Sequence, residues 1–135
     1  MSESRTERVC AMVGLWNAGH HGSERLAEYF APAIELESPL SSVHGSPYRG
    51  YGGIEQWARD LDEHFVEWSI GLDDLREIGD QVLAISTINA RGRASDVSLQ
   101  FSAATVLDFG TDDRAERVRI YTDVPEALKA VGLEG

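Results

Sequence analysis

The spacing of apolar residues changes along the chain, from a helical period in the first half to a strand period in the second. Ser4 and Glu7 form a capping box near the start. Behind it, apolar residues recur at positions i, i+3, i+4 and i+7, namely Val9, Met12, Val13 and Trp16. This pattern predicts an amphipathic helix that ends near Gly19.

A second, shorter helix is predicted from about Ser23, and Pro32 is expected to end it. Apolar and polar residues alternate over 33–37, which predicts a short strand with Ile34 and Leu36 on its buried face. The segment 38–53 is rich in Ser, Pro and Gly and is predicted to be a long loop. Long loops in compact domains often carry function.

The clearest helix is predicted at about 53–67. Its apolar residues keep helical spacing for about four turns and include Ile54, Trp57, Ala58, Leu61, Phe65 and Trp68. The period then changes to two. Strands are predicted near 69–78, 81–91, 97–109 and 115–122, and a short helix over 125–131 closes the chain.

Tight turns between these strands imply an antiparallel meander. The predicted fold is therefore a single α+β domain over 1–135. In it, a curved antiparallel sheet wraps around a long helix, the helices lie on one face, and an apolar cavity remains between helix and sheet. The expected lining of that cavity includes Trp16, Trp57, Phe101 and Ile120.

The predicted strand 81–91 is apolar on both faces. Val82 and Ile88 share one face, and Leu83 and Ile85 share the other. The helices can cover only one face, so something else must cover the other. We therefore expect a homodimer joined through the outer faces of the sheets.

The excess of acidic residues argues against some classes of binding partner. The 135 residues include 23 acidic and 12 basic side chains, for a formal net charge of -11. Such a surface repels phosphate backbones and anionic lipids, so neither nucleic acid nor a membrane is an expected partner. Cys10, the only cysteine, lies in an apolar helical stretch and is expected in the core. The absence of a signal-peptide pattern indicates a cytoplasmic protein.

Several short stretches, in this order and spacing, carry a resemblance to a known family. They are 15–19, 37–39, 48–50 with 53–54 and Trp57, 79–82, and 121–123. Together they resemble the SnoaL-like polyketide-cyclase family, within the superfamily of nuclear transport factor two and ketosteroid isomerase. The resemblance implies a cone-shaped fold with an apolar pocket, and often a homodimer. It implies no single activity, because members include isomerases, cyclases, epoxide hydrolases, dehydratases and binding modules.

The resemblance also implies that this chain lacks several catalytic groups of the family. Ser38 stands where a ketosteroid isomerase has its basic carboxylate, and Met12 and Thr105 stand where a tyrosine and an aspartic acid hold the enolate oxygen. Serine needs an activator to act as a base, methionine cannot donate a hydrogen bond, and threonine is a weaker donor. Steroid isomerisation is therefore not expected. A register shift of one residue would instead turn Glu37 inward as a base.

Two other family activities lack their groups as well. The set used by epoxide hydrolases falls at Thr87, Asn89 and Ile120, and the histidine and aspartate of the cyclases fall at Thr105 and Ile120. Among the remaining polar residues, Asp123, Tyr48 and His44 are candidate acid–base groups. Each has a structural alternative: Asp123 also fits a helix N-cap, Tyr48 could cover the core, and His44 could be an ordinary loop residue.

The candidate ligand-binding residues are mostly apolar. They are Met12, Trp16, Ser38, Trp57, Leu61, Phe101, Ala103, Thr105, Ile120 and Tyr121. The same side chains could simply fill the core, and free volume is expected at the small residues Ala103 and Thr105. No metal or cofactor is predicted, because the histidines lack ligand spacing and no phosphate-binding motif occurs.

We therefore expect a SnoaL-like domain that binds a small apolar molecule, with no reaction assigned. The alternative is an isomerase, cyclase or dehydratase that acts on a cyclic or polyketide-like carbonyl compound by acid–base chemistry. A carboxylate or imidazole that points into the cavity would favour the second hypothesis.

Overall fold

The computed structural model describes residues 4–17, 26–38 and 46–132. The elements are α1 (Arg5–Asn17), α2 (Leu26–Tyr29), β1 (Phe30–Glu37), β2 (Tyr48–Arg49), α4 (Gly50–His64), β3 (Phe65–Ile78), β4 (Gln81–Gly92), β5 (Ser98–Phe109), β6 (Ala115–Tyr121) and α5 (Val124–Ala130). The strands form one six-stranded sheet in the order β2-β1-β6-β5-β4-β3. The α+β class is confirmed.

The sheet is mixed rather than wholly antiparallel. Strands β3 to β6 form the predicted antiparallel meander. β1, however, runs parallel to β6, with Leu36 beside Val118, and β2 returns antiparallel to β1. A parallel pair needs a long connection, which here contains α4 and the strands β3 to β5. Local alternation cannot reveal such a pairing, because it does not specify which strand lies next to β1.

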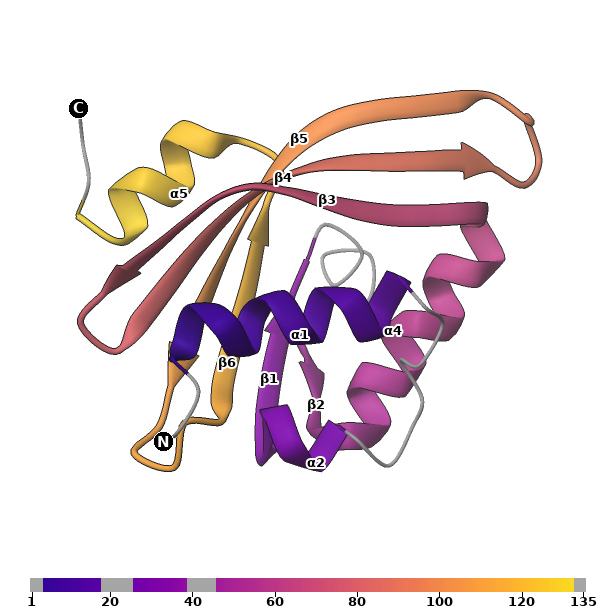
Figure 1. Ribbon diagram of the computed structural model, residues 1–135. Coiled ribbons are helices and arrows are strands. Elements are labelled where there is room, and N and C mark those ends of the chain that lie inside the picture. Colours follow the sequence, from indigo (N-terminus) through magenta and orange to yellow (C-terminus); the bar gives the residue numbers. More distant parts are fainter. Residues whose placement is uncertain (1–3, 18–25, 39–45, 133–135) are drawn as a thin grey trace.

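The core lies between the inner face of the sheet and the helices α1 and α4. Figure 1 shows the curved strands β3, β4 and β5 passing over these two helices. Strand register puts Val82, Leu107 and Val118 side by side on the inner face. They pack in one buried cluster with residues of both helices, including Val9, Ile54, Trp57 and Leu61. We call the part of this cluster around Val82, Leu107, Phe109 and Ala115 the core end.

The expectation that all helices lie on one face is wrong, because α5 packs on the outer face of the sheet (Figure 1). Ala127 of α5 and the strand residues Leu83, Ala104 and Val106 are fully buried together. The outer apolar face of β4 is thus covered in large part by a helix of the same chain.

Two element boundaries differ from the prediction. The long helix ends at His64, and Phe65 and Trp68 belong to β3, where they pair with Gly92 and Ala90 of β4. The predicted second helix gives way at Phe30 to β1, which runs through Pro32. The β1–β6 pairing is irregular between Phe30 and Glu35, which is where a residue without an N–H is tolerated.

Two smaller predictions also need correction. Cys10 is exposed on α1 and is not a core residue, because the buried stripe of that helix passes through Val9. The predicted loop over 38–53 contains β2 and the first turn of α4. None of the helices in the described part of the chain is both long and apolar enough to span a membrane.

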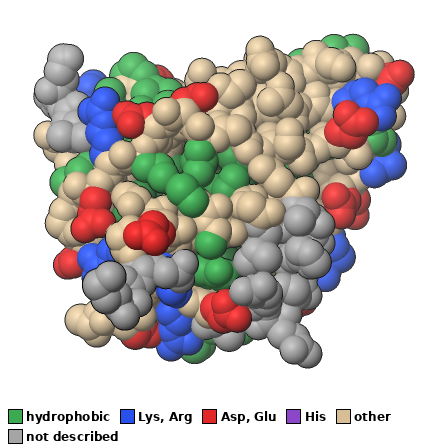
Figure 2. Space-filling view, in the orientation of Figure 1, with side chains coloured by type: hydrophobic (Ala, Val, Ile, Leu, Met, Phe, Trp, Pro, Cys, Tyr) green, Lys and Arg blue, Asp and Glu red, His purple; other side chains and the backbone are tan. Residues whose placement is uncertain are grey.

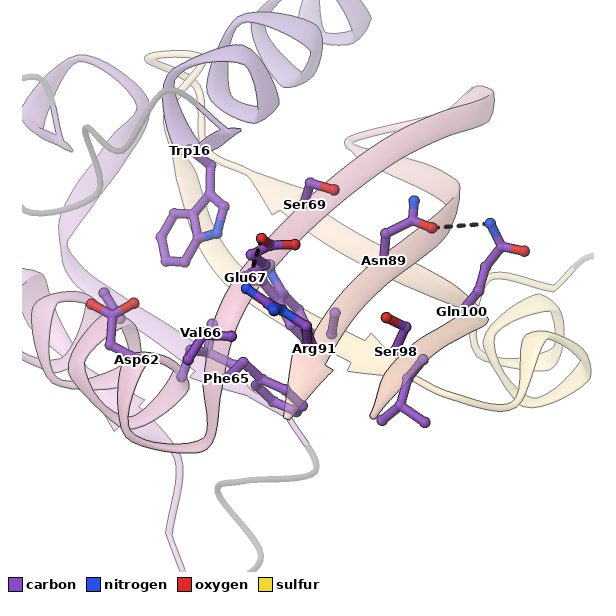
Figure 3. Close-up of a pocket in the computed structure, with 15 residues that line it drawn as sticks. Trp16, Asp62, Phe65, Val66, Glu67, Ser69, Asn89, Arg91, Ser98 and Gln100 are labelled. Atoms are coloured by element: carbon purple, nitrogen blue, oxygen red, sulfur yellow. Dashed lines mark hydrogen bonds and ion pairs between the residues drawn. The ribbon is translucent and has the colours of Figure 1, made fainter. Parts of the chain in front are cut away.

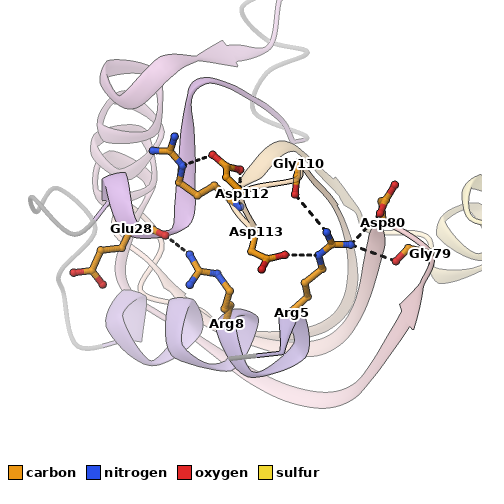
Figure 4. Close-up of polar contacts among 9 residues, drawn as sticks. Arg5, Arg8, Glu28, Gly79, Asp80, Gly110, Asp112 and Asp113 are labelled. Carbon is orange, nitrogen blue, oxygen red and sulfur yellow. Dashed lines mark hydrogen bonds and ion pairs between the residues drawn. The ribbon is translucent and has the colours of Figure 1, made fainter. Parts of the chain in front are cut away.

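Arg5 ties the start of α1 to two turns at the core end (Figure 4). Its Nη1 lies 3.1 Å from Asp80 Oδ1 and its Nε lies 3.1 Å from Asp113 Oδ1. The guanidinium also donates to the carbonyl oxygens of Gly79 and Gly110. The hydrogen bond to Asp80 raises the pKa of Arg5, so this charge persists at any ordinary pH. One side chain thereby joins the β3–β4 turn, the β5–β6 turn and α1.

The other end of α1 is fixed to β3, an edge strand of the sheet. Asn17 Nδ2 donates to Ile70 O at 2.8 Å, and Asn17 Oδ1 accepts from Ile70 N at 2.9 Å. The amide side chain therefore occupies both backbone hydrogen-bonding groups of one edge residue. α1 is held at each end by a polar side chain, with its apolar stripe packed between them.

Candidate functional site

A cavity of about 790 Å³ opens where the C-terminal ends of α1 and α4 face β3, β4 and β5 (Figure 3). We call this end of the molecule the mouth. The helices contribute Trp16, Ala58, Leu61 and Asp62. The strands contribute the other lining residues, Phe65, Val66, Glu67, Trp68, Ser69, Asn89, Ala90, Arg91, Ser98, Leu99 and Gln100. The volume is in the range of cavities that hold small organic ligands.

Three aromatic side chains, Trp16, Phe65 and Trp68, form part of the wall beside polar residues. Trp16 packs on Trp57 with ring centroids 4.6 Å apart. Trp68 packs against Phe65 at 5.3 Å and against Phe101 at 6.4 Å. These contacts fix the ring orientations, since each ring at the cavity rests on another behind or beside it. The buried indole Nε1 of Trp68 has no hydrogen-bond partner among the described residues.

The rim of the mouth is partly apolar and partly charged. Val66 and Leu99 are 40% and 45% exposed, so two large apolar side chains are open to solvent at the rim. Arg91 pairs with Glu67 and with Asp96, each at 3.0 Å. Asn89 Oδ1 accepts a hydrogen bond from Gln100 Nε2 at 3.0 Å. Figure 3 shows the carboxylate of Asp62 pointing from α4 toward Trp16.

A buried polar pair lies outside the lining of this cavity. The hydroxyl of Tyr48 donates to Asp60 Oδ2 at 2.6 Å, and Gln56 Nε2 donates to Asp60 Oδ1 at 2.8 Å. Burial raises the pKa of Tyr48 far above its ordinary value, and the hydrogen bond to Asp60 raises it further. Tyr48 therefore keeps its proton and acts as a donor.

A family model described as the SnoaL-like domain matches residues 9–118 of the chain. The chain belongs to the SnoaL-like family. A comparison with curated proteins finds no match.

Solved structures share the fold of this SnoaL-like chain. An NTF2-like protein of unknown function from Burkholderia pseudomallei aligns with a TM-score of 0.78 and 15% identity, over 96% of this chain and 98% of that one. TerC, co-crystallized with polyporic acid, aligns at 0.77 and 15%, over 94% and 96%. A hypothetical protein with a ketosteroid isomerase-like fold from Catenulispora acidiphila, in complex with trimethylamine, aligns at 0.73 and 17%, over 94% and 93%. At these identities the likeness shows the fold alone.

Some of the predicted ligand-binding residues lie in or next to the cavity at the mouth. Trp16 and Leu61 line it, Trp57 stacks on Trp16, and Phe101 contacts Trp68. Met12 and Ile120 pack against the buried cluster between the helices and the sheet.

The cavity lies nearer the strand ends than expected. Ala90 and Leu99 form its sheet side, whereas Ala103 and Thr105 lie further along the inner face of β5 and do not line it. Tyr121 points to the outer face beside α5, because alternation along β6 places it opposite Ile120.

The polar candidates are dispersed. Tyr48 is not in a loop over the mouth: it is buried in β2, where it pairs with Leu36. Asp123 is exposed and occupies the N-cap position of α5, without a side-chain capping hydrogen bond. Ser38 is buried directly after β1. His44 lies outside the described residues.

The strand register decides the question of Glu37. Ile34 and Leu36 are buried on the inner face, and Glu37 points outward, where it pairs with Arg117 at 3.0 Å. The predicted alternation of this strand is confirmed. Glu37 therefore does not face the cavity.

The sequence interpretation missed several lining residues, chiefly Trp68 and Asp62. Phe65 and Trp68 were assigned to a helix face, although the segment 65–70 is rich in aromatic and β-branched residues that favour a strand. That composition was the available signal. No signal in the sequence distinguishes Asp62 from the other carboxylates of α4.

Proposed function

We propose that this SnoaL-like domain binds a small, largely apolar molecule in the cavity at the mouth. The observation that carries the proposal is a cavity of about 790 Å³ with three aromatic side chains, Trp16, Phe65 and Trp68, in its wall. Aromatic rings already held in place by their neighbours lose little conformational freedom when a ligand packs on them. A wall of this kind favours flat, apolar ligands.

The structural neighbours lend support at the level of the fold. TerC was crystallized with polyporic acid, and the Catenulispora acidiphila protein holds trimethylamine. Proteins with this architecture therefore accommodate small organic molecules that differ widely in size and charge. The ligand class of this chain depends on its own lining residues.

The second candidate is an isomerase, cyclase or dehydratase that works by acid–base chemistry on a cyclic or polyketide-like carbonyl compound. The observation in its favour is Asp62, a carboxylate that lines the cavity. Asp62 is exposed, however, and a well-hydrated carboxylate is a weak base toward a carbon acid. The buried donor Tyr48 does not line the cavity, and Glu37 faces the other side of the sheet. Binding without catalysis is therefore the better supported function.

Intrinsic fluorescence provides a direct test. The chain has three tryptophans, of which Trp16 and Trp68 line the cavity and Trp57 stacks on Trp16. Titration with the neutral apolar probe N-phenyl-1-naphthylamine should therefore quench tryptophan emission. Replacement of Trp16 by Ala should weaken probe binding about tenfold, because a large aromatic contact is lost.

The matched control is Leu128→Ala, which removes an apolar side chain that is packed under α5 on the outer face. This variant should bind the probe as the wild type does. Probe binding that is absent, or that survives unchanged in Trp16→Ala, would contradict the proposal.

The homodimer remains a prediction with less support than the sequence suggested. The apolar residues of β4 that motivated it, Leu83 and Ile85, pack against α5 of the same chain. Beyond α5 the outer face carries polar side chains such as Thr87, and those of Asn89 and Gln100 extend from this face at the rim of the cavity. Figure 2 shows a different face, the one that α1 crosses in Figure 1, where acidic and basic groups are interspersed around an apolar patch. A dimer through the outer faces would be a polar interface, and light scattering would detect it.

A further inference from the structure

We propose that the cavity prefers apolar molecules that carry a positively charged amine, with the carboxylate of Asp62 as the counter-charge. The inference rests on the proposed function, because it names the ligand class for the same cavity. It follows from two features of the lining, the balance of charges and the aromatic wall.

The charges that line the cavity are two carboxylates, Asp62 and Glu67, and one guanidinium, Arg91. Arg91 is already held by Glu67 and by Asp96, each at 3.0 Å. An anionic ligand would therefore have to displace a carboxylate from Arg91. The whole chain adds a formal charge of -11, which attracts cations and repels anions before they reach the mouth.

Asp62 differs from Glu67 because its carboxylate has no ion pair among the described residues. Arg93 lies nearby, but its Nε donates to the backbone oxygen of Asp62 at 2.9 Å and its Nη2 to that of Phe65 at 3.4 Å. If Arg93 and Asp96 are added to the three lining charges, the local sum is still one negative charge. Figure 3 shows the Asp62 carboxylate directed toward Trp16.

The aromatic wall favours the same class of ligand. The face of an indole or phenyl ring attracts an ammonium group, and the attraction strengthens as water is excluded. Trp16, Phe65 and Trp68 all line the cavity that Asp62 also lines. An ammonium group between the Asp62 carboxylate and this wall would gain a charge contact and a ring contact together, while the apolar body of the ligand fills the rest of the cavity.

The expected preference is modest, because Asp62 is exposed and exposed charge pairs are weakened by water and salt. We expect the amine to bind about fivefold more tightly than a neutral analogue at low ionic strength. The preference should shrink as salt is added, because the charge contact is screened.

The experiment compares three ligands with one apolar body: 1-naphthylmethylamine, 1-naphthylmethanol and 1-naphthylacetate. Calorimetric titration at neutral pH should rank them in the order amine, alcohol, carboxylate. Asp62→Asn should reduce the affinity for the amine to that for the alcohol. Glu63→Gln makes the same change in net charge on the neighbouring residue, which does not line the cavity, and should retain the preference.

The outcomes separate the two proposals. If the alcohol binds as tightly as the amine, or if Asp62→Asn retains the full preference, the amine inference is wrong while the binding function stands. If Glu63→Gln abolishes the preference as fully as Asp62→Asn does, the effect comes from overall charge, and the role of Asp62 is refuted. If neither the alcohol nor the neutral fluorescent probe binds, the binding function fails and the inference fails with it.

Discussion

Strand β5 runs from the core end to the mouth, and a leucine on its inner face is buried at the first and exposed at the second. Leu107, at the core end, is 4% exposed, and Leu99, at the mouth, is 45% exposed. Both leucines lie on the inner face of the strand, eight residues apart by number. The difference comes from what covers them: the core end is closed by the packed cluster beneath it, while the mouth opens on the cavity.

The contrast indicates that one end of the sheet contributes mainly to stability and the other end to binding. Burial of apolar surface at the core end stabilises the fold, and apolar surface left open at the mouth is available to a ligand. Helix α1 spans both regions, since Arg5 is tied to the core end and Trp16 lines the mouth. A substitution should therefore affect either stability or binding, according to its position along the same elements.

The largest effect should come from truncating the two leucines of β5. Leu107→Ala leaves a hole in a packed cluster and should lower the free energy of unfolding by about 2 to 4 kcal/mol in urea titrations. Leu99→Ala removes a side chain that is nearly half exposed and should cost less than about 1 kcal/mol. Equal losses of stability would remove the distinction between the two regions.

A smaller effect is expected at the polar pair within the core. Tyr48→Phe removes a donor from the buried carboxylate of Asp60 and should lower the free energy of unfolding by about 1 to 3 kcal/mol. Tyr51→Phe is the control, because its hydroxyl donates to a backbone oxygen, that of Phe30, in a partly buried site. The control should lose less stability, and a loss in Tyr48→Phe no larger than that in the control would contradict a special cost for the buried pair.

The same pair predicts how stability changes at high pH. The raised pKa of Tyr48 means that the folded protein holds the phenol proton more tightly than the unfolded chain, in which tyrosine ionises near about pH 10. This contribution is fully present below that pH and is lost as the pH rises above it. The free energy of unfolding, measured at a series of pH values from neutral to alkaline, should thus decline less steeply in Tyr48→Phe than in the wild type.

The smallest effect should come from the ion pairs of Arg5. Arg5→Ala should lower the free energy of unfolding by about 1 kcal/mol, because the partly buried guanidinium holds two turns and α1 together. Arg76→Ala is the control, since the exposed Arg76 pairs with Asp74 only two residues away. The control should be close to wild type, and Arg5→Ala should bind the fluorescent probe normally. Weakened binding in that variant would show that the two ends of α1 are coupled.

Local sequence patterns were enough to predict most elements of the fold. The capping box and apolar stripe locate α1, and alternation locates β1 and the four-stranded meander within a few residues. The boundary at His64 was missed because Phe65 and Trp68 also satisfy helical spacing. Pairing with Gly92 and Ala90 of β4 places them in a strand, and that pairing is a long-range contact which no local window contains.

The candidate site was harder to predict, because it depends on which elements meet. Alternation correctly turned Glu37 outward. It could not show that Tyr48 would be buried against Asp60, or that the cavity would lie beside Leu99 rather than Ala103. The apolar outer face of β4 did indicate that a cover was needed, but the pattern cannot say whether that cover is another molecule or, as with Leu83, the chain's own helix α5.

The contact between Asn17 and Ile70 has a consequence for solubility as well as for packing. An unpaired strand at the edge of a sheet can recruit strands from other molecules, which leads to aggregation. β3 is such an edge, and the side chain of Asn17 occupies both backbone groups of one of its residues, as a neighbouring strand would. An incoming strand would have to displace the end of α1 before it could pair through that point. Asn17, the last residue of α1, thus protects the edge strand β3 from pairing with strands of other molecules.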